Sequence, residues 1–303
     1  MEQRYFVGVD GGGTKTALVA CTSDGCEVAS AVCGPLNYNF IGLDAALENL
    51  RAGIEALALP TGSIVAVGIG DPSIDDIAES PTAQAFAARA TSLLGVPVHI
   101  RSDAYMTLFA LTGGKKTGVL IISGTGSMAI GEDGTHKTAV VGGWGRLTGD
   151  EGSGYYIGRE GICAALRAFD GIAESTALTD AALSHFGVCA PRDLISVFYG
   201  DKEPDVAGFA RCVADCAASG DKVAKEIFLD AAAHLSRYAS VLLECCHANL
   251  LGVWGSVLCK NQIVRQAFED GVRKNFPHVT ICEPEISAEL AAALYAAKQE
   301  KGE

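Results

Sequence analysis

The stretch "YFVGVDGGGTKTALVAC" (Tyr5–Cys21) places three consecutive glycines between two short apolar runs. Short apolar runs bounded by glycine are typical of strands, so the stretch predicts a strand, a glycine turn and a second strand. Neither common glycine motif fits. No helical pattern follows the glycines, as a dinucleotide fingerprint requires, and Thr14 separates the last glycine from Lys15, unlike in a P-loop. The turn can still bind an anion through bare amides, threonine hydroxyls and the lysine charge, although an ordinary tight hairpin also fits.

Asp10 ends the first predicted strand, directly before the glycine turn. Its carboxylate would repel a phosphate group unless a divalent cation lay between them. If the turn binds phosphate, Asp10 therefore indicates Mg²⁺.

The composition describes a well-packed globular chain with 49% hydrophobic and 19% charged residues. A length of 303 residues favours two domains. The net charge of −13 argues against non-specific binding to nucleic acid or to an anionic membrane surface. We find no signal-peptide pattern and no apolar stretch near the roughly 18 residues of a membrane span. Eleven cysteines without a C-x-x-C pair fit reduced thiols in a cytoplasm.

The opening pattern occurs a second time in "GVLIISGTGSMAIG" (residues 118–131), with Gly124, Thr125 and Gly126 at its turn. Two hairpins built alike in successive halves indicate a duplicated lobe, and two such turns could clamp one polyphosphate. Between them, strands alternate with helices, which indicates an α/β sheet with parallel strands. The second half is richer in helices. No linker separates the halves, so we expect two lobes that join near Lys115–Lys116 around a cleft.

Helix boundaries can be predicted from apolar periodicity and from capping residues. The helical periodicity of "NFIGLDAALENLRAGIEALAL" predicts one helix over residues 39–59. Further helices are expected to begin after Ser153, Asp205 and Asp221, and another near Asn261.

Two stretches carry candidate chemical groups. Asp103 lies at the carboxyl end of the predicted strand "VPVHIRSD", where α/β sheets place ligand crevices. It can accept a proton during phosphoryl transfer, or it can simply cap the next helix. "GGWGRLTGDEGSGYYIG" (residues 142–158) combines seven glycines with Trp144, Asp150 and Glu151. Such a loop can bring backbone amides, aromatic rings and carboxylates to one small polar ligand, and the carboxylates can accept hydrogen bonds from sugar hydroxyls. A solvated surface loop is the alternative.

Two further turns stand beside predicted elements. Asn37 and Asn39 lie in a turn before a helix, where asparagine is commonly structural. "NLLGVWGSVLCKN" reads as a strand, a Gly255–Ser256 turn and a helix. A flat base could lie against that small-residue turn, which also fits an ordinary connection.

Together and in this order, five segments resemble the sugar-kinase branch of the actin/Hsp70/hexokinase ATPase superfamily, and more narrowly the N-acetylglucosamine kinase family, grouped with the BadF/BadG-type ATPases. The segments are "GVDGGGTKT", "SDAYMTL", "ISGTGSMA", "GGWGRLTGDEGSGYYIGRE" and "WGSV". The fourth is the most diagnostic. The resemblance runs from about Tyr5 to about Ala297 and implies an α/β, two-lobed, actin-like ATPase (ribonuclease H-like) fold with duplicated lobes and a cleft between them. The lobes would be residues 1–115, joined by the C-terminal helix 287–303, and residues 116–286.

The resemblance also implies roles for individual residues. Asp103 would be the catalytic base on the sugar 6-hydroxyl, and Asp10 would orient Mg²⁺ through its water shell. The ATP-binding residues would be Gly12, Gly13, Thr14 and Lys15 in the first phosphate turn, Gly124, Thr125 and Gly126 in the second, and Gly255 and Ser256 beside the adenosine. The sugar-binding residues would be Asn37, Trp144, Gly145 and Asp150.

The implied activity is ATP-dependent phosphorylation of an amino sugar, N-acetylglucosamine first, with glucosamine and N-acetylmuramic acid as alternatives. We expect a cytoplasmic homodimer with a small-molecule substrate and neither nucleic acid nor membrane as partner. Two departures bear on the nucleotide side. "VGIGDPSIDD" lacks a second small-residue pair, and Glu289 stands where a Gly-Ala pair commonly begins the last helix.

Two other classes remain. An ATPase that activates a radical dehydratase or reductase would bridge a [4Fe–4S] cluster through cysteines near the second phosphate turn, but none follows it before Cys163. A sugar-responsive repressor would add a helix-turn-helix segment and basic charge.

Overall fold

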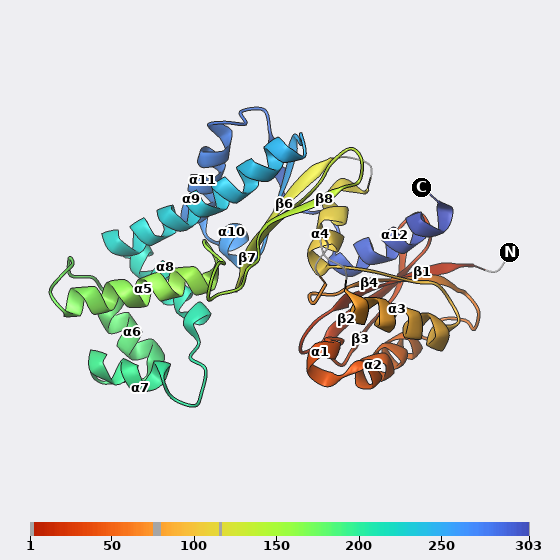
Figure 1. Ribbon diagram of the computed structural model, residues 1–303, viewed down its shortest axis with the longest axis horizontal. Coiled ribbons are helices and arrows are strands. Elements are labelled where there is room, and N and C mark those ends of the chain that lie inside the picture. The colour runs from red at the N-terminus through yellow and green to blue at the C-terminus, as the bar shows by residue number, and fades with distance from the viewer. Residues whose placement is uncertain (1–2, 75–79, 115–116, 303) are drawn as a thin grey trace. The chain divides into compact units, whose positions relative to one another are not determined.

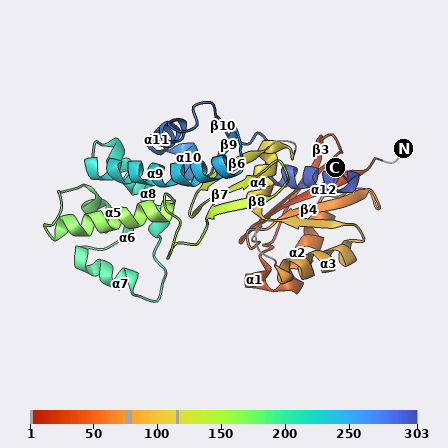
Figure 2. The ribbon, with the colours of Figure 1, turned by 45° about the horizontal axis from the view of Figure 1, so that its top comes forward.

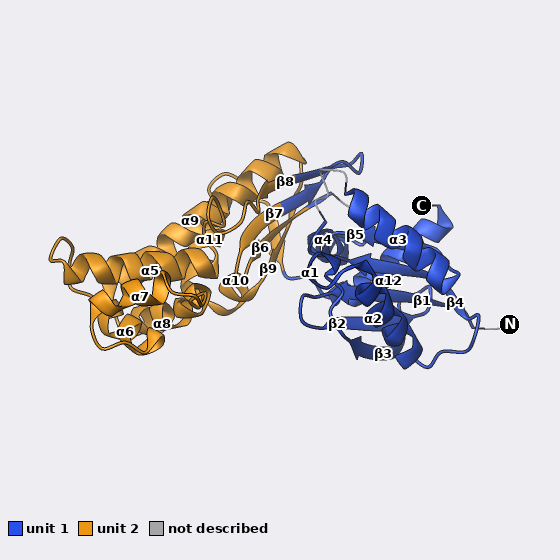
Figure 3. Cartoon of the chain, turned by 60° about the horizontal axis from the view of Figure 1, so that its bottom comes forward, with its two compact units in different colours: residues 1–118, 130–139, 283–303 blue, residues 119–129, 140–282 orange. Residues whose placement is uncertain are grey.

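The computed structural model describes residues 3–74, 80–114 and 117–302. Their contacts divide the chain into two compact units (Figure 3). Unit 1 comprises residues 1–118, 130–139 and 283–303, and unit 2 comprises residues 119–129 and 140–282. The lobe junction expected near Lys115–Lys116 lies outside the described residues.

The sheet of unit 1 has five strands in the order β3-β2-β1-β4-β5. They are β1 (Tyr5–Gly11), β2 (Thr16–Cys21), β3 (Glu27–Cys33), β4 (Ile64–Gly70) and β5 (Val98–Arg101). β1 and β2 pair antiparallel from Phe6↔Cys21 to Gly11↔Thr16, which confirms the predicted strand, glycine turn and strand. β4 runs parallel to β1, and β5 runs parallel to β4. The carboxyl ends of β1, β4 and β5 therefore meet at one edge.

Helices cover both faces of this sheet (Figures 1 and 2). They are α1 (Tyr38–Ile41), α2 (Leu43–Ala56), α3 (Pro81–Leu94), α4 (Asp103–Thr112) and α12 (Ala288–Lys301). Side chains alternate across a strand, so Val7 and Val9 join the core under α2 and α3, whereas Phe6 joins the core under α12. The C-terminal helix thus completes the core of the N-terminal sheet.

The α12 backbone lies almost directly on two strand glycines. A Cβ on Gly8 would overlap the Glu289 carbonyl oxygen, and one on Gly68 would overlap the Ala292 carbonyl oxygen. Glycine is therefore required at both positions by close packing rather than by an unusual backbone angle.

The sheet of unit 2 has the strand order β10-β9-β6-β7-β8. Its strands are β6 (Gly118–Ser123), β7 (Ser127–Glu132), β8 (Thr138–Gly142), β9 (Leu250–Trp254) and β10 (Thr280–Cys282). The β7–β8 hairpin end, residues 130–139, groups with unit 1. The Gly124–Gly126 turn joins β6 and β7, neighbours in this sheet, which confirms the second strand, turn and strand.

Unit 2 also contains most of the helices (Figure 1). They are α5 (Gly154–Phe169), α6 (Leu178–Phe186), the 3-10 turn η1 (Pro191–Asp193), α7 (Leu194–Phe198), α8 (Val206–Ala218), α9 (Lys222–Cys245), α10 (Ser256–Lys260) and α11 (Gln262–Arg273). None of the helices in the described ranges combines the length and the apolar character needed to cross a membrane.

The predicted caps are confirmed, and two helix predictions need correction. Side chains of Ser153, Asp205 and Asp221 cap α5, α8 and α9. The single helix expected over residues 39–59 is two helices, because Gly42 at φ +83° interrupts it. The helix expected near Asn261 is preceded by the short α10, so Ser256 begins a helix rather than ending a turn.

Gly8→Ala tests the contact between α12 and the sheet. The added methyl group meets backbone atoms that cannot rotate away, so we expect a loss of about 1–3 kcal/mol in the free energy of unfolding. Urea unfolding measures it. Gly13→Ala is the control because no atom lies within 4 Å of its Cβ position. Equal stability of the two variants would contradict the contact.

Candidate functional site

Unit 1 presents two carboxylates at the carboxyl edge of its sheet. Asp10 on β1 is level with Gly70 on β4, and Gly70 is level with Arg101 on β5. Asp103 follows Arg101 after one residue, and its Cα would lie 3.4 Å from a Cβ on Gly70. The register of three adjacent strands therefore brings Asp10 and Asp103 to the same edge.

Asp103 is not the cap of its helix. The Ser102 hydroxyl accepts a hydrogen bond from the Tyr105 amide at 2.8 Å and fills that role. Asp103 is the first residue of α4, and its Oδ1 accepts from the Ala104 amide at 2.7 Å. The capping alternative for Asp103 is therefore wrong.

The first turn of α4 is held by a chain of polar contacts within unit 1. The Arg101 guanidinium lies 3.5 Å from the centroid of the Tyr105 ring. The Tyr105 hydroxyl donates to the buried Glu132 carboxylate at 2.6 Å. Arg101 and Tyr105 flank Asp103 in the sequence, so these contacts hold the backbone on either side of it.

The charges at this edge perturb Asp10. Burial raises the pKa of the Asp10 carboxyl from 3.8 to about 6, and the negative charges of Asp103 and Glu289 act in the same direction. Glu289 comes from the first turn of α12, where it was noted as a departure from the family. The edge thus has an excess of negative charge that a cation would compensate.

The first glycine turn is open to solvent. Gly13, Thr14 and Lys15 are exposed. A Cβ on Gly12 would overlap the Lys15 carbonyl oxygen, so the turn itself requires that glycine. The turn can offer amides, a hydroxyl and a positive charge to a phosphate group.

Asn37 has a structural role in unit 1. Its Oδ1 accepts from the Asn39 amide at 3.2 Å and caps α1. Because Oδ1 is engaged, the Nδ2 amide is the part of this side chain that could donate to a sugar hydroxyl.

The second glycine turn is fastened to the start of α5. The Gly154 amide donates to the Gly124 carbonyl at 2.7 Å, and the Tyr155 amide donates to the Thr125 carbonyl at 3.2 Å. Gly124 also donates to Gly126 at 2.9 Å. With these carbonyls occupied, the turn has mainly donors to offer a ligand.

Gly255 packs on this turn. It is the N-cap residue of α10 at φ +94°, and a Cβ there would overlap Ser123 O and lie 3.0 Å from Gly124 N. The positive φ and the close approach to Ser123 both require glycine at position 255. The next residue, Ser256, therefore lies beside the second turn.

The glycine-rich loop, defined here as residues 142–154, carries the remaining sugar-site candidates. Asp150 is buried at φ +60°, a conformation that few residues other than glycine adopt. Its Oδ2 would lie 2.9 Å from a Cβ on Gly126. Trp144, in contrast, is 76% exposed.

Two pockets of unit 2 share Thr125. A pocket of about 500 Å³ is lined by residues of the second turn and of α5, α8, α9 and α10, among them Gly124, Arg211, Ser256, Lys260 and Asn261. A pocket of about 620 Å³ is lined by residues of the second turn, the glycine-rich loop and the segment before α8, among them Gly126, Gly145, Arg146, Asp150 and Glu203. Of the candidates, Ser256 therefore lines one pocket and Gly145 and Asp150 line the other, and the two pockets meet at Thr125 of the second turn.

Several functional candidates were missed by sequence reasoning. Arg211 and Lys260 line the first pocket, and Arg146, paired with Glu203 at 2.5 Å, lines the second. Single charges on helices and loops carry no motif, so only their place in the fold identifies them.

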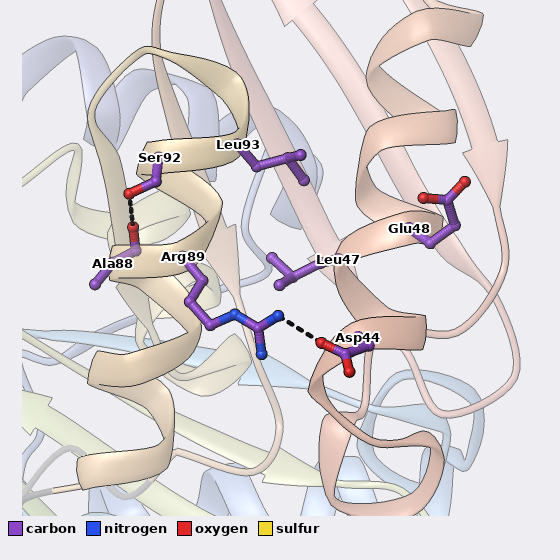
Figure 4. A pocket seen from close by; sticks show the side chains of 7 residues that line it. All are labelled: Asp44, Leu47, Glu48, Ala88, Arg89, Ser92 and Leu93. Atoms are coloured by element: carbon purple, nitrogen blue, oxygen red, sulfur yellow. Dashed lines mark hydrogen bonds and ion pairs between the residues drawn. The ribbon is translucent and has the colours of Figure 1, made fainter.

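A hollow between α2 and α3 in unit 1 is not a comparable site (Figure 4). Asp44 and Arg89 pair across it, and the remaining lining is helix surface such as Leu47 and Leu93. Glu48, which also lines it, pairs with Arg51, so each carboxylate of this hollow is already engaged in an ion pair.

Protein side chains alone do not form a metal centre in the described ranges, where no group of three or more His, Cys, Asp or Glu is suitably clustered. A cation at the Asp10 edge would need ligands from water or substrate.

Comparison with known proteins gives one family and close relatives along the whole chain. Residues 7–296 match the BadF/BadG/BcrA/BcrD ATPase family. An N-acetyl-D-glucosamine kinase of Dictyostelium discoideum is 30% identical over 96% of this chain and 98% of its own. An N-acetylmuramic acid/N-acetylglucosamine kinase of Clostridium acetobutylicum is 29% identical over 97% and 98%.

A solved structure of a candidate N-acetylglucosamine kinase from Chromobacterium violaceum superimposes with a TM-score of 0.70. It is 26% identical and covers 97% of this chain and 99% of its own. The α/β, two-lobed actin-like fold implied by the resemblance is confirmed.

Asp10→Asn tests the charge at the sheet edge. A carboxyl whose folded pKa is raised from 3.8 to about 6 stabilises the fold below the unfolded pKa, and this stabilisation is lost as the pH rises through 6. Without nucleotide, the variant should therefore gain thermal stability over the wild type at about pH 8 and gain none at about pH 3.5. Differential scanning calorimetry at both values measures the difference. The exposed Asp201→Asn is the control, and a pH-independent gain for Asp10→Asn would contradict the interpretation.

Proposed function

The chain belongs to the BadF/BadG/BcrA/BcrD ATPase family, and we propose that it is an ATP-dependent kinase that phosphorylates the 6-hydroxyl of an amino sugar, N-acetylglucosamine first. Two relatives that match almost end to end are named as kinases of N-acetylated amino sugars, which supports the substrate class. The observation that carries the proposal is the place of Asp103, which lies in the first turn of α4 at the sheet edge that also holds Asp10.

Asp103 is proposed to act on the acceptor. It accepts the 6-hydroxyl proton as the bond from sugar oxygen to γ-phosphorus forms and the bond from that phosphorus to the ADP oxygen breaks. Phosphoryl transfer depends mainly on position and charge, so a carboxylate on a rigid helix start suits the task.

The residues around Asp10 fit Mg²⁺. Bound together with ATP, the ion would neutralise charge on the phosphate oxygens. Asp10, crowded by Asp103 and Glu289, would hold it through water and lose its raised pKa in doing so.

The other residues are proposed to bind substrates. Gly12–Lys15 and Gly124–Gly126 form the two turns that bind the phosphates, and Gly255 and Ser256 flank the adenosine. Asn37, Trp144, Gly145 and Asp150 bind the sugar, with Asp150 accepting from its hydroxyls.

We propose a cytoplasmic homodimer. All eleven cysteines are free thiols, which fits a reducing compartment. Light scattering of the purified protein determines the number of subunits.

A coupled assay of ADP release tests the function. Release should require both Mg²⁺ and an amino sugar, with the highest kcat/KM for N-acetylglucosamine among that sugar, glucosamine, N-acetylmuramic acid and glucose. Phosphate on the 6-position of the product, assigned by NMR, completes the test. ADP release that no sugar stimulates, from a protein with bound iron and sulfide, would instead indicate the electron-transfer ATPase.

Asp103→Asn should lower kcat by about 10²–10⁴-fold, because it removes the base and keeps the size. The variant should not lose thermal stability, since Ser102 caps the helix and the charge next to Asp10 is removed, and nucleotide binding should stay nearly unchanged. Ser102→Ala is the complementary variant and should lose stability by about 0.5–2 kcal/mol. If Asp103→Asn keeps most of its kcat, the base lies elsewhere.

A further inference from the structure

One face of α9 supports both ends of the glycine-rich loop. Ala231, Leu235 and Tyr238 are spaced four and three residues apart and share that face. A Cβ on Gly142 would lie 2.5 Å from Tyr238 Cε2. A Cβ on Gly152 would lie 2.6 Å from Leu235 Cγ and 2.7 Å from the Ala231 carbonyl oxygen. The loop therefore begins and ends in direct contact with this helix.

Tyr238 makes a second contact through its hydroxyl. It donates a hydrogen bond to Glu151 Oε2, next to Asp150 in the chain. The bond lowers the pKa of Glu151, while burial and this carboxylate raise that of Tyr238. Glu151 therefore turns toward α9 as a charged acceptor, so the suggestion that it accepts sugar hydroxyls is not supported.

The remaining fastenings of the loop involve its backbone. The Ser127 hydroxyl donates to the Glu151 carbonyl and the Ser123 hydroxyl to the Gly152 carbonyl, both at 2.8 Å. The Gly143 amide donates to the Ser127 carbonyl at 3.1 Å. These bonds hold the loop backbone against Ser123 of β6 and Ser127 of β7. Tyr238 instead contacts the Glu151 side chain at one end of the loop and Gly142 at the other.

We propose that Tyr238 is a positioning residue of the sugar site, which holds both ends of the glycine-rich loop so that Gly145 and Asp150 keep their places in the pocket. The identity of the ligand rests on the proposed function, but the contacts do not. Asp150 has a backbone conformation that persists only where its surroundings enforce it, and Glu151 is the adjacent anchor. Without the hydroxyl, Asp150 can relax toward an ordinary conformation and leave the pocket.

The first experiment needs no activity. The chain has two tryptophans, of which Trp144 lies within the loop, so Trp254→Phe leaves a single reporter. In that background, Tyr238→Phe should increase the fast component of Trp144 anisotropy decay. Glu151→Gln, which keeps an oxygen acceptor, should change it less than Glu151→Leu.

The second experiment separates the substrates. Loss of a hydrogen bond to a charged group should raise the KM for sugar by about tenfold or more in Tyr238→Phe. The KM for ATP should stay unchanged, and Glu151→Gln should again be milder than Glu151→Leu. Leu242→Ala, a core change on the same helix, is the control and should lower Tm without altering the ratio of the two KM values.

The two experiments distinguish the proposal from its premise. If the wild type shows no sugar-dependent turnover, the proposed function fails, and the anisotropy measurement still decides the role of Tyr238. Wild-type anisotropy and KM values in Tyr238→Phe would overturn the proposal. So would parallel increases in both KM values that follow Tm as in Leu242→Ala.

Discussion

Contact of backbone with backbone, possible only where a Cβ is missing, is the constraint on which both units depend. In unit 1, α12 rests on Gly8 and Gly68, so the end of the chain completes the core of its beginning. In unit 2, Gly255 rests on the second turn, and Gly152 rests on α9. Gly8, Gly152 and Gly255 each lie within two residues of a group proposed to bind substrate or metal. Tight packing, rather than flexibility, is thus the reason for much of the glycine in this chain.

The same contact in unit 1 has an electrostatic consequence. A helix seated that closely brings its first turn, with Glu289, toward the carboxyl edge of the sheet. Asp10 and Asp103 already lie at that edge, and the charge of Glu289 raises the pKa of Asp10 further. The arrangement costs stability at neutral pH when nothing is bound, and a bound cation would recover it. Local repulsion of this kind is expected where binding energy rather than folding energy is being optimised.

Much of this arrangement could be predicted from the sequence, because local patterns determine it. The Tyr5–Cys21 hairpin, the caps at Ser153 and Asp205, and the position of Asp103 after a strand all follow from residues close together in the chain. What could not be predicted depends on residues distant in sequence. Ser102 was overlooked as the N-cap of α4 because serine and aspartate are about equally favoured at that position, and Asp103 stands next to it. Tyr238 reads as an ordinary member of the α9 apolar stripe until its partner Glu151, 87 residues away, is seen.

The second turn shows how a hairpin can act on an anion without presenting a helix end to it. In a P-loop the first amides of a helix contact the phosphate directly. Here the first amides of α5 donate instead to the carbonyls of Gly124 and Thr125. These bonds occupy the acceptors that would repel a phosphate, and they place the positive end of the helix dipole behind the turn. Thr125, an exposed residue, is then backed by the first turn of α5. In the proposed phosphate site, the helix therefore acts through the turn rather than by direct contact.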